Sequence, residues 1–343
     1  MRRVIPPLSV LDSIAIGPGI TANQALQWTT QIAVVAEQLG YQRLWVVEHH
    51  GVPDIGCGSP AIMIAHLASV TRRIRLGSGG VMLPNHAPLV VAEEFSMLQG
   101  LYPNRIDLGV GRASGTDPAT AIALRREAAS DERFAQQLSE LSSFLKREFP
   151  SGHHYEKVKI PLEVVPPPIY LLGSSESSAH LAALYGLPYV FAHHLNPEAT
   201  SSALAVYRKE FQRRGALKEP YAIVTVAAVC APSKEEAEQS AIGASIVRVR
   251  RGVALQHGID VSPDVLLYPS WSDEELRVAE KALSGGWILV GAPEQLMVGL
   301  MNLYQITEAD ELMLTTIEYD GAERIRTLKA ISNAYYLTNS LIS

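Results

Sequence analysis

The chain has 343 residues, of which 47% are hydrophobic and 19% are charged, and its formal net charge is −6. This composition is typical of a folded globular protein and excludes an intrinsically disordered one. Lys and Arg are scattered rather than clustered, so the sequence does not favour a nucleic acid or an anionic membrane as a partner.

The cysteines and the hydrophobic runs bear on cellular location. Cys57 and Cys230 lie far apart, without the spacing of a metal site, which is typical of reduced thiols. Prolines and Asp12 interrupt the stretch after Arg2-Arg3, and no run reaches the roughly eighteen apolar residues of a membrane span. We therefore expect a cytoplasmic protein that is neither secreted nor inserted in a membrane.

Strand-like and helix-like segments alternate along the first half of the chain. The hydrophobic pattern predicts strands at residues 8–11, 44–47, 74–77 and 106–110. It predicts helices at residues 21–39, 59–70 and 88–101, the second of which opens with Ser59-Pro60. Residues 118–149 are also helical in character.

The same alternation continues after a proline-rich connection at residues 151–168. Strands are predicted at residues 169–172, 189–192, 222–229 and 311–315. Helices are predicted at residues 175–185, 197–213, 234–251 and 324–336. Residues 252–286, which include Pro263, Pro269 and a short helical pattern, break the rhythm.

Eight strands that alternate with helices predict an α/β protein with a (β/α)8 TIM-barrel fold. The long insertion at residues 252–286 would follow strand seven, and residues 1–343 would form one domain. A doubly wound open sheet is the main alternative, although it would more naturally have about five to seven strands. Insertions of this kind often act as lids, to which Tyr268 and Trp271 would contribute unless they pack in the core.

The second predicted strand ends abruptly in ionisable residues, Glu48-His49-His50. The carboxyl ends of strands are where α/β proteins place their chemistry. Two histidines beside a carboxylate can move protons, bind a metal or stabilise an anion. A purely structural, hydrogen-bonded role is equally compatible with this pattern.

Three later strand ends are rich in glycine and hydroxyl groups. Adjacent Gly79 and Gly80 would let a flat ligand lie against the backbone, unless they form an ordinary bulge. Arg112 follows a G-x-G-x-x-x-G spacing that does not fit a dinucleotide fingerprint, and it would either bind a phosphate or face solvent. Residues 173–178, Gly-Ser-Ser-Glu-Ser-Ser, precede a helix and predict a phosphate site. His193 and His194 follow the sixth strand, and we expect one of them to be structural.

Four motifs, in this order, resemble those of the bacterial luciferase-like flavin monooxygenase family, and the similarity spans nearly the whole chain. They are Glu-His-His at 48–50, Gly-Gly-Val-Met-Leu-Pro at 79–84, Arg-Ile-Asp-Leu-Gly-Val-Gly-Arg at 105–112 and Tyr-Gly-Leu-Pro at 185–188. The resemblance implies a barrel that binds reduced FMN, forms a C4a-peroxyflavin with O2 and oxidises a small organic substrate.

The resemblance also implies roles for individual residues. His49 matches the active-site histidine that stabilises or protonates the peroxyflavin. Gly79-Gly80 match a non-proline cis peptide behind the isoalloxazine ring. The phosphate contacts match Arg112, Ser174, Ser175 and Ser178, and no metal is implied.

Two positions depart from bacterial luciferase itself. Gly111 stands where a reactive cysteine precedes the matching arginine, and Ser174 replaces an acidic residue, so light emission is not predicted. Since no credible NAD(P)H fingerprint is present, a separate flavin reductase would supply reduced FMN. F420 is the alternative cofactor for the same pocket, and family analogy favours a homodimer.

Two other functions remain open from the sequence. A metal-dependent hydrolase could be built from His49, His50, His86, His193 and His194, although residues 8–12 lack the HxH spacing such barrels use. A flavin-binding accessory protein without turnover would also retain these motifs. The sequence does not identify the substrate.

Overall fold

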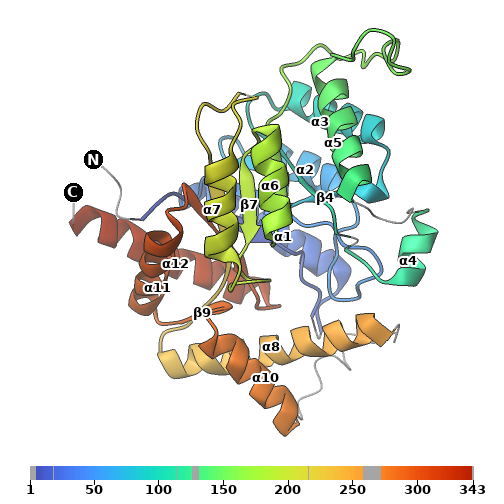
Figure 1. The fold of residues 1–343 in the computed structure, drawn as a ribbon. Helices are drawn as coiled ribbons and strands as arrows, with labels where there is room; N and C mark the ends of the chain where they lie inside the picture. Colours follow the sequence, from blue (N-terminus) through green and yellow to red (C-terminus); the bar gives the residue numbers. More distant parts are fainter. Residues whose placement is uncertain are drawn as a thin grey trace.

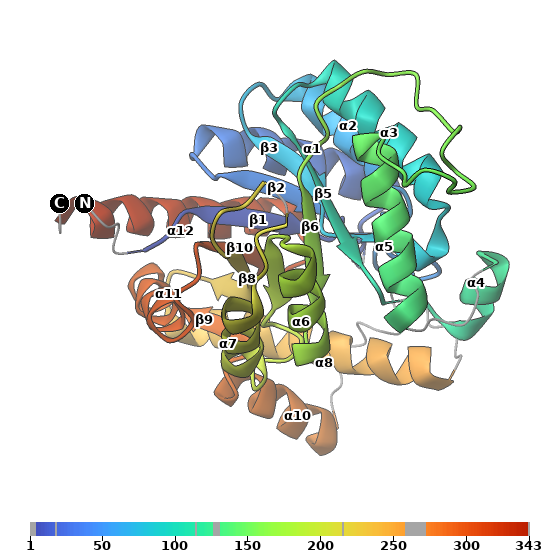
Figure 2. The same cartoon turned by 45° about the horizontal axis from the view of Figure 1, so that its top comes forward.

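Eight parallel strands close into a barrel in the computed structural model, which describes residues 5–17, 19–113, 115–125, 131–214, 216–257 and 272–341. In order around the barrel they are β1 (Leu8–Asp12), β2 (Arg43–Val46), β3 (Arg75–Ser78), β5 (Ile106–Gly111), β6 (Ile169–Gly173), β7 (Tyr189–Ala192), β8 (Ala222–Cys230) and β10 (Glu311–Thr316). β10 pairs with both β8 and β1 and closes the ring (Figure 2). The predicted eight-stranded α/β barrel is confirmed.

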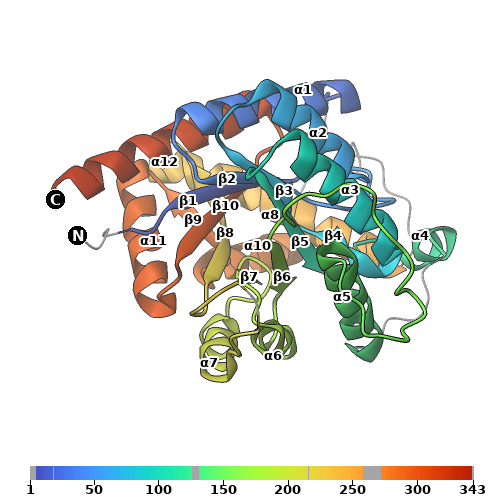
Figure 3. The ribbon, with the colours of Figure 1, turned by 90° about the horizontal axis from the view of Figure 1, so that it is seen from above.

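Helices surround this barrel, as the view from above shows (Figure 3). They are α1 (Ala22–Gln38), α2 (Pro60–Val70), α3 (Pro88–Leu101), α5 (Asp131–Lys146), α6 (Glu176–Tyr185), α7 (Thr200–Glu210), α11 (Pro293–Thr307) and α12 (Gly321–Leu341). Most begin as the sequence predicts, with Pro60 at the first position of α2 and a Thr21 cap on α1. Among the described residues, no helix has the combined length and apolarity to cross a membrane.

Two predicted segments differ from the structure. The helical stretch 118–149 contains two helices, α4 (Pro118–Ala123) and α5, because Arg125 adopts a positive φ of 54° and ends the first one. The loop after β3 contains a short strand, β4 (Val81–Met82), which pairs with β5, and a 3-10 turn, η1 (Leu83–Asn85).

The chain between β8 and β10 holds two elements that the sequence analysis missed. β9 (Ile288–Gly291) pairs with the outer part of β8, and α11 follows it. Gly291 has a φ of 152° and Pro293 occupies the first turn of α11, so a four-residue strand is separated from the helix by a sharp turn. β9 lies outside the eight-stranded ring, so the regular barrel pattern gave no reason to expect it.

The predicted insertion at 252–286 is only partly within the described residues. Helix α8 (Lys234–His257) continues into it, and α10 (Asp273–Ser284) lies beside α8 below the barrel in Figure 1. Tyr268 and Trp271 lie outside the described residues. The insertion and its role as a lid therefore stay predictions, as does the single domain over residues 1–343.

Alternate residues of the barrel strands face inward and pack in layers. On β2, Leu44 and Val46 belong to the large core between strands and helices, whereas Trp45 belongs to a second cluster inside the barrel. Leu11 and Met313 join Trp45 in that inner cluster. The strands read as continuous apolar runs because both of their faces are buried.

The amino-terminal end of the barrel interior is filled by a buried ionic network. Arg43 donates to both carboxylate oxygens of Glu311, at 2.8 and 2.9 Å, and to Asp107 at 2.7 Å. Arg75 also pairs with Asp107, and Tyr221 donates to Glu311 at 2.9 Å. This network closes one end of the barrel, so a ligand can enter only from the other.

Candidate active site

A cavity of about 470 Å³ lies at the carboxyl ends of the barrel strands. Each of the eight strands, or the residue just after it, contributes to its wall. In barrel order these residues are Leu11, Val47, Gly79, Gly111, Ser174, Ala192, Thr225 and Thr315. Active sites of this fold occupy this position, because all strand ends meet there.

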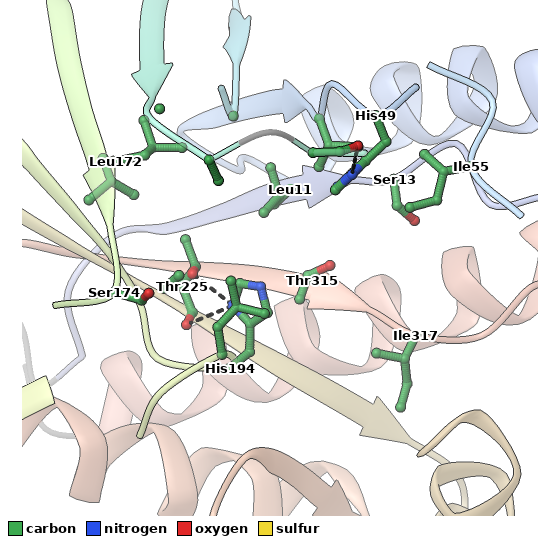
Figure 4. Close-up of a pocket in the computed structure, with 18 of the residues that line it drawn as sticks. Leu11, Ser13, His49, Ile55, Leu172, Ser174, His194, Thr225, Thr315 and Ile317 are labelled. Atoms are coloured by element: carbon green, nitrogen blue, oxygen red, sulfur yellow. Dashed lines mark hydrogen bonds between the residues drawn. The ribbon is translucent and has the colours of Figure 1, made fainter. Parts of the chain in front are cut away.

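Figure 4 shows that the cavity has two chemically different ends. Ser174 and Leu172 lie at one end, His49 and Ile55 lie at the other, and Leu11 lies between them. Ser174 and His49 are two of the site residues that the sequence predicted. A ligand that spans both ends would pass Leu11.

The twin glycines form part of the wall between these ends. The peptide bond between Gly79 and Gly80 is cis, as the family resemblance implied. A Cβ on Gly79 would collide with Cδ1 of Leu11, and one on Gly80 would lie 2.9 Å from the carbonyl oxygen of Gly109. Gly79 itself lines the cavity, whereas the position of a Gly80 side chain is filled by β5.

His49 lies at the cavity end away from the serines and is held by the backbone. Its Nδ1 lies 3.0 Å from the carbonyl oxygen of Gly115, and its backbone N–H donates to Cys57 O at 2.9 Å. Since a carbonyl oxygen can only accept, Nδ1 must carry the proton. Nε2 is therefore the ring atom that can accept a hydrogen bond in neutral His49.

At the other end, the serines build the start of helix α6. Ser175 caps the helix by accepting from Ser178 N at 3.3 Å, and Ser178 Oγ donates to Ser175 O at 2.7 Å. Tyr189 OH lies 2.8 Å from Ser178 Oγ. The Ser178 hydroxyl is therefore engaged within the protein, although Ser174, Ser175 and Ser178 all line the cavity.

Gly173 permits this tight arrangement. A Cβ at Gly173 would collide with Oγ of Ser178, so a larger residue would push α6 away from β6. The helix N-terminus thus faces the cavity directly, with the positive end of its dipole toward any bound anion.

Arg112 lines the cavity and also forms an ion pair with Asp131, the first residue of α5. The two side chains are 45% and 65% exposed. An exposed ion pair contributes little to stability, so Arg112 can exchange this partner for an anion in the cavity.

The adjacent histidines after β7 have different roles. His193 bonds at both ring nitrogens, to Thr200 Oγ1 at 2.7 Å and Gly286 O at 3.2 Å, and burial lowers its pKa. His194 lines the cavity and its Nδ1 lies 2.9 Å from Thr225 Oγ1. As expected, one of the pair is structural, and it is His193.

The five histidines proposed for a hydrolase do not converge. His50 and His86 approach each other through Glu48, and both place Nε2 at 2.8 Å from Glu48 Oε1. His49 and His194 line the cavity without joining that cluster. Cys57 is an unsuitable nucleophile, because burial raises its pKa to about 12.

Several cavity residues were not identified from the sequence. Tyr319 donates to Asp54 Oδ2 at 3.1 Å on the His49 side of the cavity. Thr315 and Thr316 end β10, the same strand that carries Glu311 at the closed end of the barrel. The available signal for Thr315 and Ile317 was their place at the end of a barrel strand. Both continue the alternation that points every second residue of β10 into the barrel.

Comparison with known proteins now identifies the family. Residues 7–310 match the model described as luciferase-like monooxygenase. The chain belongs to the luciferase-like flavin-dependent monooxygenase family. It is 37% identical over 330 residues to the luciferase-like monooxygenase of Escherichia coli (strain K12), covering 94% of each chain.

Other similar proteins support this membership in the luciferase-like monooxygenase family. The chain is 40% identical over 247 residues to the N-acetyl-S-alkylcysteine monooxygenase of Bacillus subtilis (strain 168), covering 71% of this chain and 73% of that one. The crystal structure of apo-MsnO8 matches with a TM-score of 0.82 and 31% identity, covering 98% of this chain and 99% of that one.

Relatives of this fold use FMN or F420. One structure, the oxygenating constituent of 3,6-diketocamphane monooxygenase from Pseudomonas putida in complex with FMN, has a TM-score of 0.72 and 21% identity, covering 97% and 98% of the two chains. An F420-dependent secondary alcohol dehydrogenase with an F420-acetone adduct has a TM-score of 0.70 and 14% identity, covering 96% and 99%. At these identities the likeness concerns the fold alone.

Proposed function

We propose that this luciferase-like monooxygenase binds reduced FMN in the described cavity and uses O2 to oxidise a small organic substrate. The observation that carries the proposal is the arrangement of one continuous cavity with an anion-binding end at α6, a side-chain-free wall at Gly79 and an imidazole at the far end. When bound, reduced flavin supplies the electrons that activate O2.

The cavity residues fit the two parts of FMN. The isoalloxazine ring would lie against Gly79, where any Cβ would collide with Leu11. The phosphate would lie at the N-terminus of α6, with Ser174, Ser175 and Ser178 around it and Arg112 beside it. Gly80 would support the ring indirectly by letting the chain pack closely on β5.

The charge of the cavity favours FMN over F420. Among the described lining residues, Arg112 is the one Lys or Arg side chain. One guanidinium and one helix N-terminus suit a single phosphate group, whereas the acidic tail of F420 would place further negative charge there without matching cations. F420 remains the second cofactor to test.

His49 would act from the opposite end of the cavity. Its Nδ1–H bond to Gly115 O fixes the ring, so Nε2 is the ring atom that would accept a hydrogen bond from oxygen-derived groups near the flavin. We assign His49 as the catalytic residue on this geometry. Exclusion of water from the cavity would prolong the lifetime of any reactive state formed there.

The substrate would be a small molecule with an apolar alkyl part. Val52, Ile55 and Ile317 form an apolar wall near His49 that suits an alkyl group. The name of the Bacillus subtilis relative makes N-acetyl-S-alkylcysteines the first compounds to test. Oxygen uptake with a series of increasing alkyl length would measure the size of this apolar wall.

The decisive experiment follows the bound flavin directly. Protein with reduced FMN, or with reduced F420, is mixed with oxygenated buffer in a stopped-flow spectrometer. We expect FMN to bind and its oxidised absorbance to return slowly. His49→Gln should accelerate that return about 10- to 100-fold, as loss of a hydrogen bond to a charged group costs about 1.5–3 kcal/mol.

Matched controls separate chemistry from binding. His153→Ala removes an imidazole outside the described cavity lining and should leave the flavin kinetics unchanged. An unchanged rate in His49→Gln would remove His49 from the mechanism. Failure of both FMN and F420 to bind would refute the proposed function.

Two partners follow as proposals. A separate reductase would supply reduced FMN, so NADH or NADPH alone should not bleach the bound flavin, whereas adding a flavin reductase should.

A second copy of the chain would pack on helices α2 and α3, where Ile62, Met97 and Leu101 are 74%, 56% and 62% exposed. These side chains form the apolar face that a homodimer would cover.

A further inference from the structure

Glu48 carries a negative charge that the described part of the protein balances in an unusual way. The side chain is fully buried at the end of β2. Its ion-pair partners are two imidazoles, His50 and His86, rather than a Lys or Arg. A buried carboxylate needs a countercharge, which either a protonated imidazole or a bound cation can supply.

The three side chains converge on a small volume. Glu48 Oε1, His50 Nε2 and His86 Nε2 all lie within 4.8 Å of one another, and each nitrogen is 2.8 Å from the oxygen. They come from two different parts of the chain, the end of β2 and the residue after η1. Two imidazoles and one carboxylate are the donor set of many zinc and non-haem iron sites.

We propose that Glu48, His50 and His86 form a binding site for one divalent transition-metal ion, with Zn²⁺ as the preferred occupant. The ion would supply the positive charge that the buried carboxylate needs, in place of a proton on the imidazoles. It would also tie the end of β2 to η1 by coordination instead of hydrogen bonds. Water would complete the coordination, and Asn85, whose Nδ2 donates to Glu48 Oε1 at 3.4 Å, would hold the carboxylate in place.

The position of this site gives the ion a structural role. None of the three ligands lines the cavity, whereas His49, which lies between Glu48 and His50 in the chain, and Met82, four residues before His86, both do. Glu48 Oε2 already accepts from Met82 N at 3.0 Å, so the carboxylate links both segments. The ion would therefore hold His49 and Met82 in place without touching flavin or substrate, and its binding is independent of the proposed function.

Metal binding can be measured on the flavin-free protein. Protein without a polyhistidine tag is treated with a chelator, dialysed and titrated with Zn²⁺ in a calorimeter, and Co²⁺ binding is followed by absorbance. We expect about one ion per chain. His86→Ala and Glu48→Gln should weaken binding roughly 100-fold or more, since loss of even an outer-sphere partner costs about 10- to 100-fold.

The control addresses adventitious binding to surface histidines. His153 and His154 stack with ring centroids 4.4 Å apart and offer a second pair of imidazoles. The double variant His153→Ala/His154→Ala should retain the ion. Loss of binding in this control, or full binding in His86→Ala, would overturn the proposal.

A measurement on the wild-type protein guards against misfolded variants. The X-ray absorption spectrum of the Zn²⁺-loaded protein should show two imidazoles and oxygen ligands only. A spectrum with sulfur ligands, or calorimetry without any saturable binding, would show that the cluster holds protons and hydrogen bonds alone.

Discussion

Substituting alanine for three glycines at the strand ends should separate flavin binding from folding. A Cβ at Gly79 would collide with the terminal carbon of Leu11, a flexible side chain that also lines the cavity. A Cβ at Gly80 would lie 2.9 Å from the backbone oxygen of Gly109, which cannot rotate away. A Cβ at Gly111 would lie 3.4 Å from Met82 Sδ and 3.8 Å from Met82 Cε, which is ordinary van der Waals contact.

These distances give a ranked expectation. In Gly79→Ala, Leu11 can move, but only into the space where the ring would lie, so the protein should fold while FMN binds more weakly. Overpacking of a filled site costs about 1–3 kcal/mol, which corresponds to roughly 5- to 150-fold in the dissociation constant. Gly80→Ala should lower the free energy of unfolding by a similar amount, whereas Gly111→Ala should change neither quantity by more than a few-fold.

Two assays read these effects separately. Quenching of FMN fluorescence during titration gives the dissociation constant, and urea denaturation gives the midpoint of unfolding. The reasoning is refuted if Gly79→Ala binds FMN like the wild type, or if Gly111→Ala loses as much affinity as Gly79→Ala. It is also refuted if Gly80→Ala is as stable as the parent protein.

Three further predictions concern the rest of the molecule. Arg43→Met leaves the buried Glu311 carboxylate without its ion-pair partner and should lower the free energy of unfolding by about 3–5 kcal/mol in urea denaturation. Adding Glu311→Gln should recover part of that loss. The ion pair with Arg250 lowers the pKa of Glu275 from 4.5 to about 2. The contact between α8 and α10 should therefore be present above pH 4.5 and lost as the pH falls toward 2. Hydrogen exchange in α10 that does not rise over this range would contradict the prediction. Ile62→Lys should shift the proposed dimer to monomer in light scattering, and an unchanged mass would exclude α2 from the interface.

Much of the fold could be predicted because its strands and helices carry strong local patterns. Helix α3 occupies the predicted range 88–101, since Pro88 starts it and its apolar residues repeat with helical spacing. The element β9 could not be predicted in this way. It extends the sheet beyond the eight-stranded ring by pairing with β8, so it belongs to none of the strand–helix units that the barrel pattern predicts.

The site was predictable to the extent that its residues follow barrel strands. His49 and Ser174 come directly after apolar runs, so the fold brought them into one cavity as expected. The cluster of Glu48 with His86 was not predicted, because 38 residues separate them and no local pattern links them. Similarly, the ion pair of Arg112 with Asp131 joins the end of β5 to the start of α5, and no local pattern in the sequence links these two residues.

The inward period of two explains how one strand serves both stability and chemistry. On β2 and its extension, Arg43 joins the ionic network, Trp45 packs in the middle of the barrel, and Val47 and His49 line the cavity. β10 repeats this order, with Glu311 in the network and Thr315 at the cavity.

The residues between them face the helices and are also apolar. The alternation between inward and outward side chains is therefore not visible in the sequence of the strand. A one-residue shift in register would exchange the two faces and bury His49 among the helices. The ionic network opposes such a shift, because it would remove Arg43 from Asp107 and Glu311 together. The charges at the closed end of the barrel therefore fix which side chains reach the open end, even though they lie in a different layer from the reacting groups.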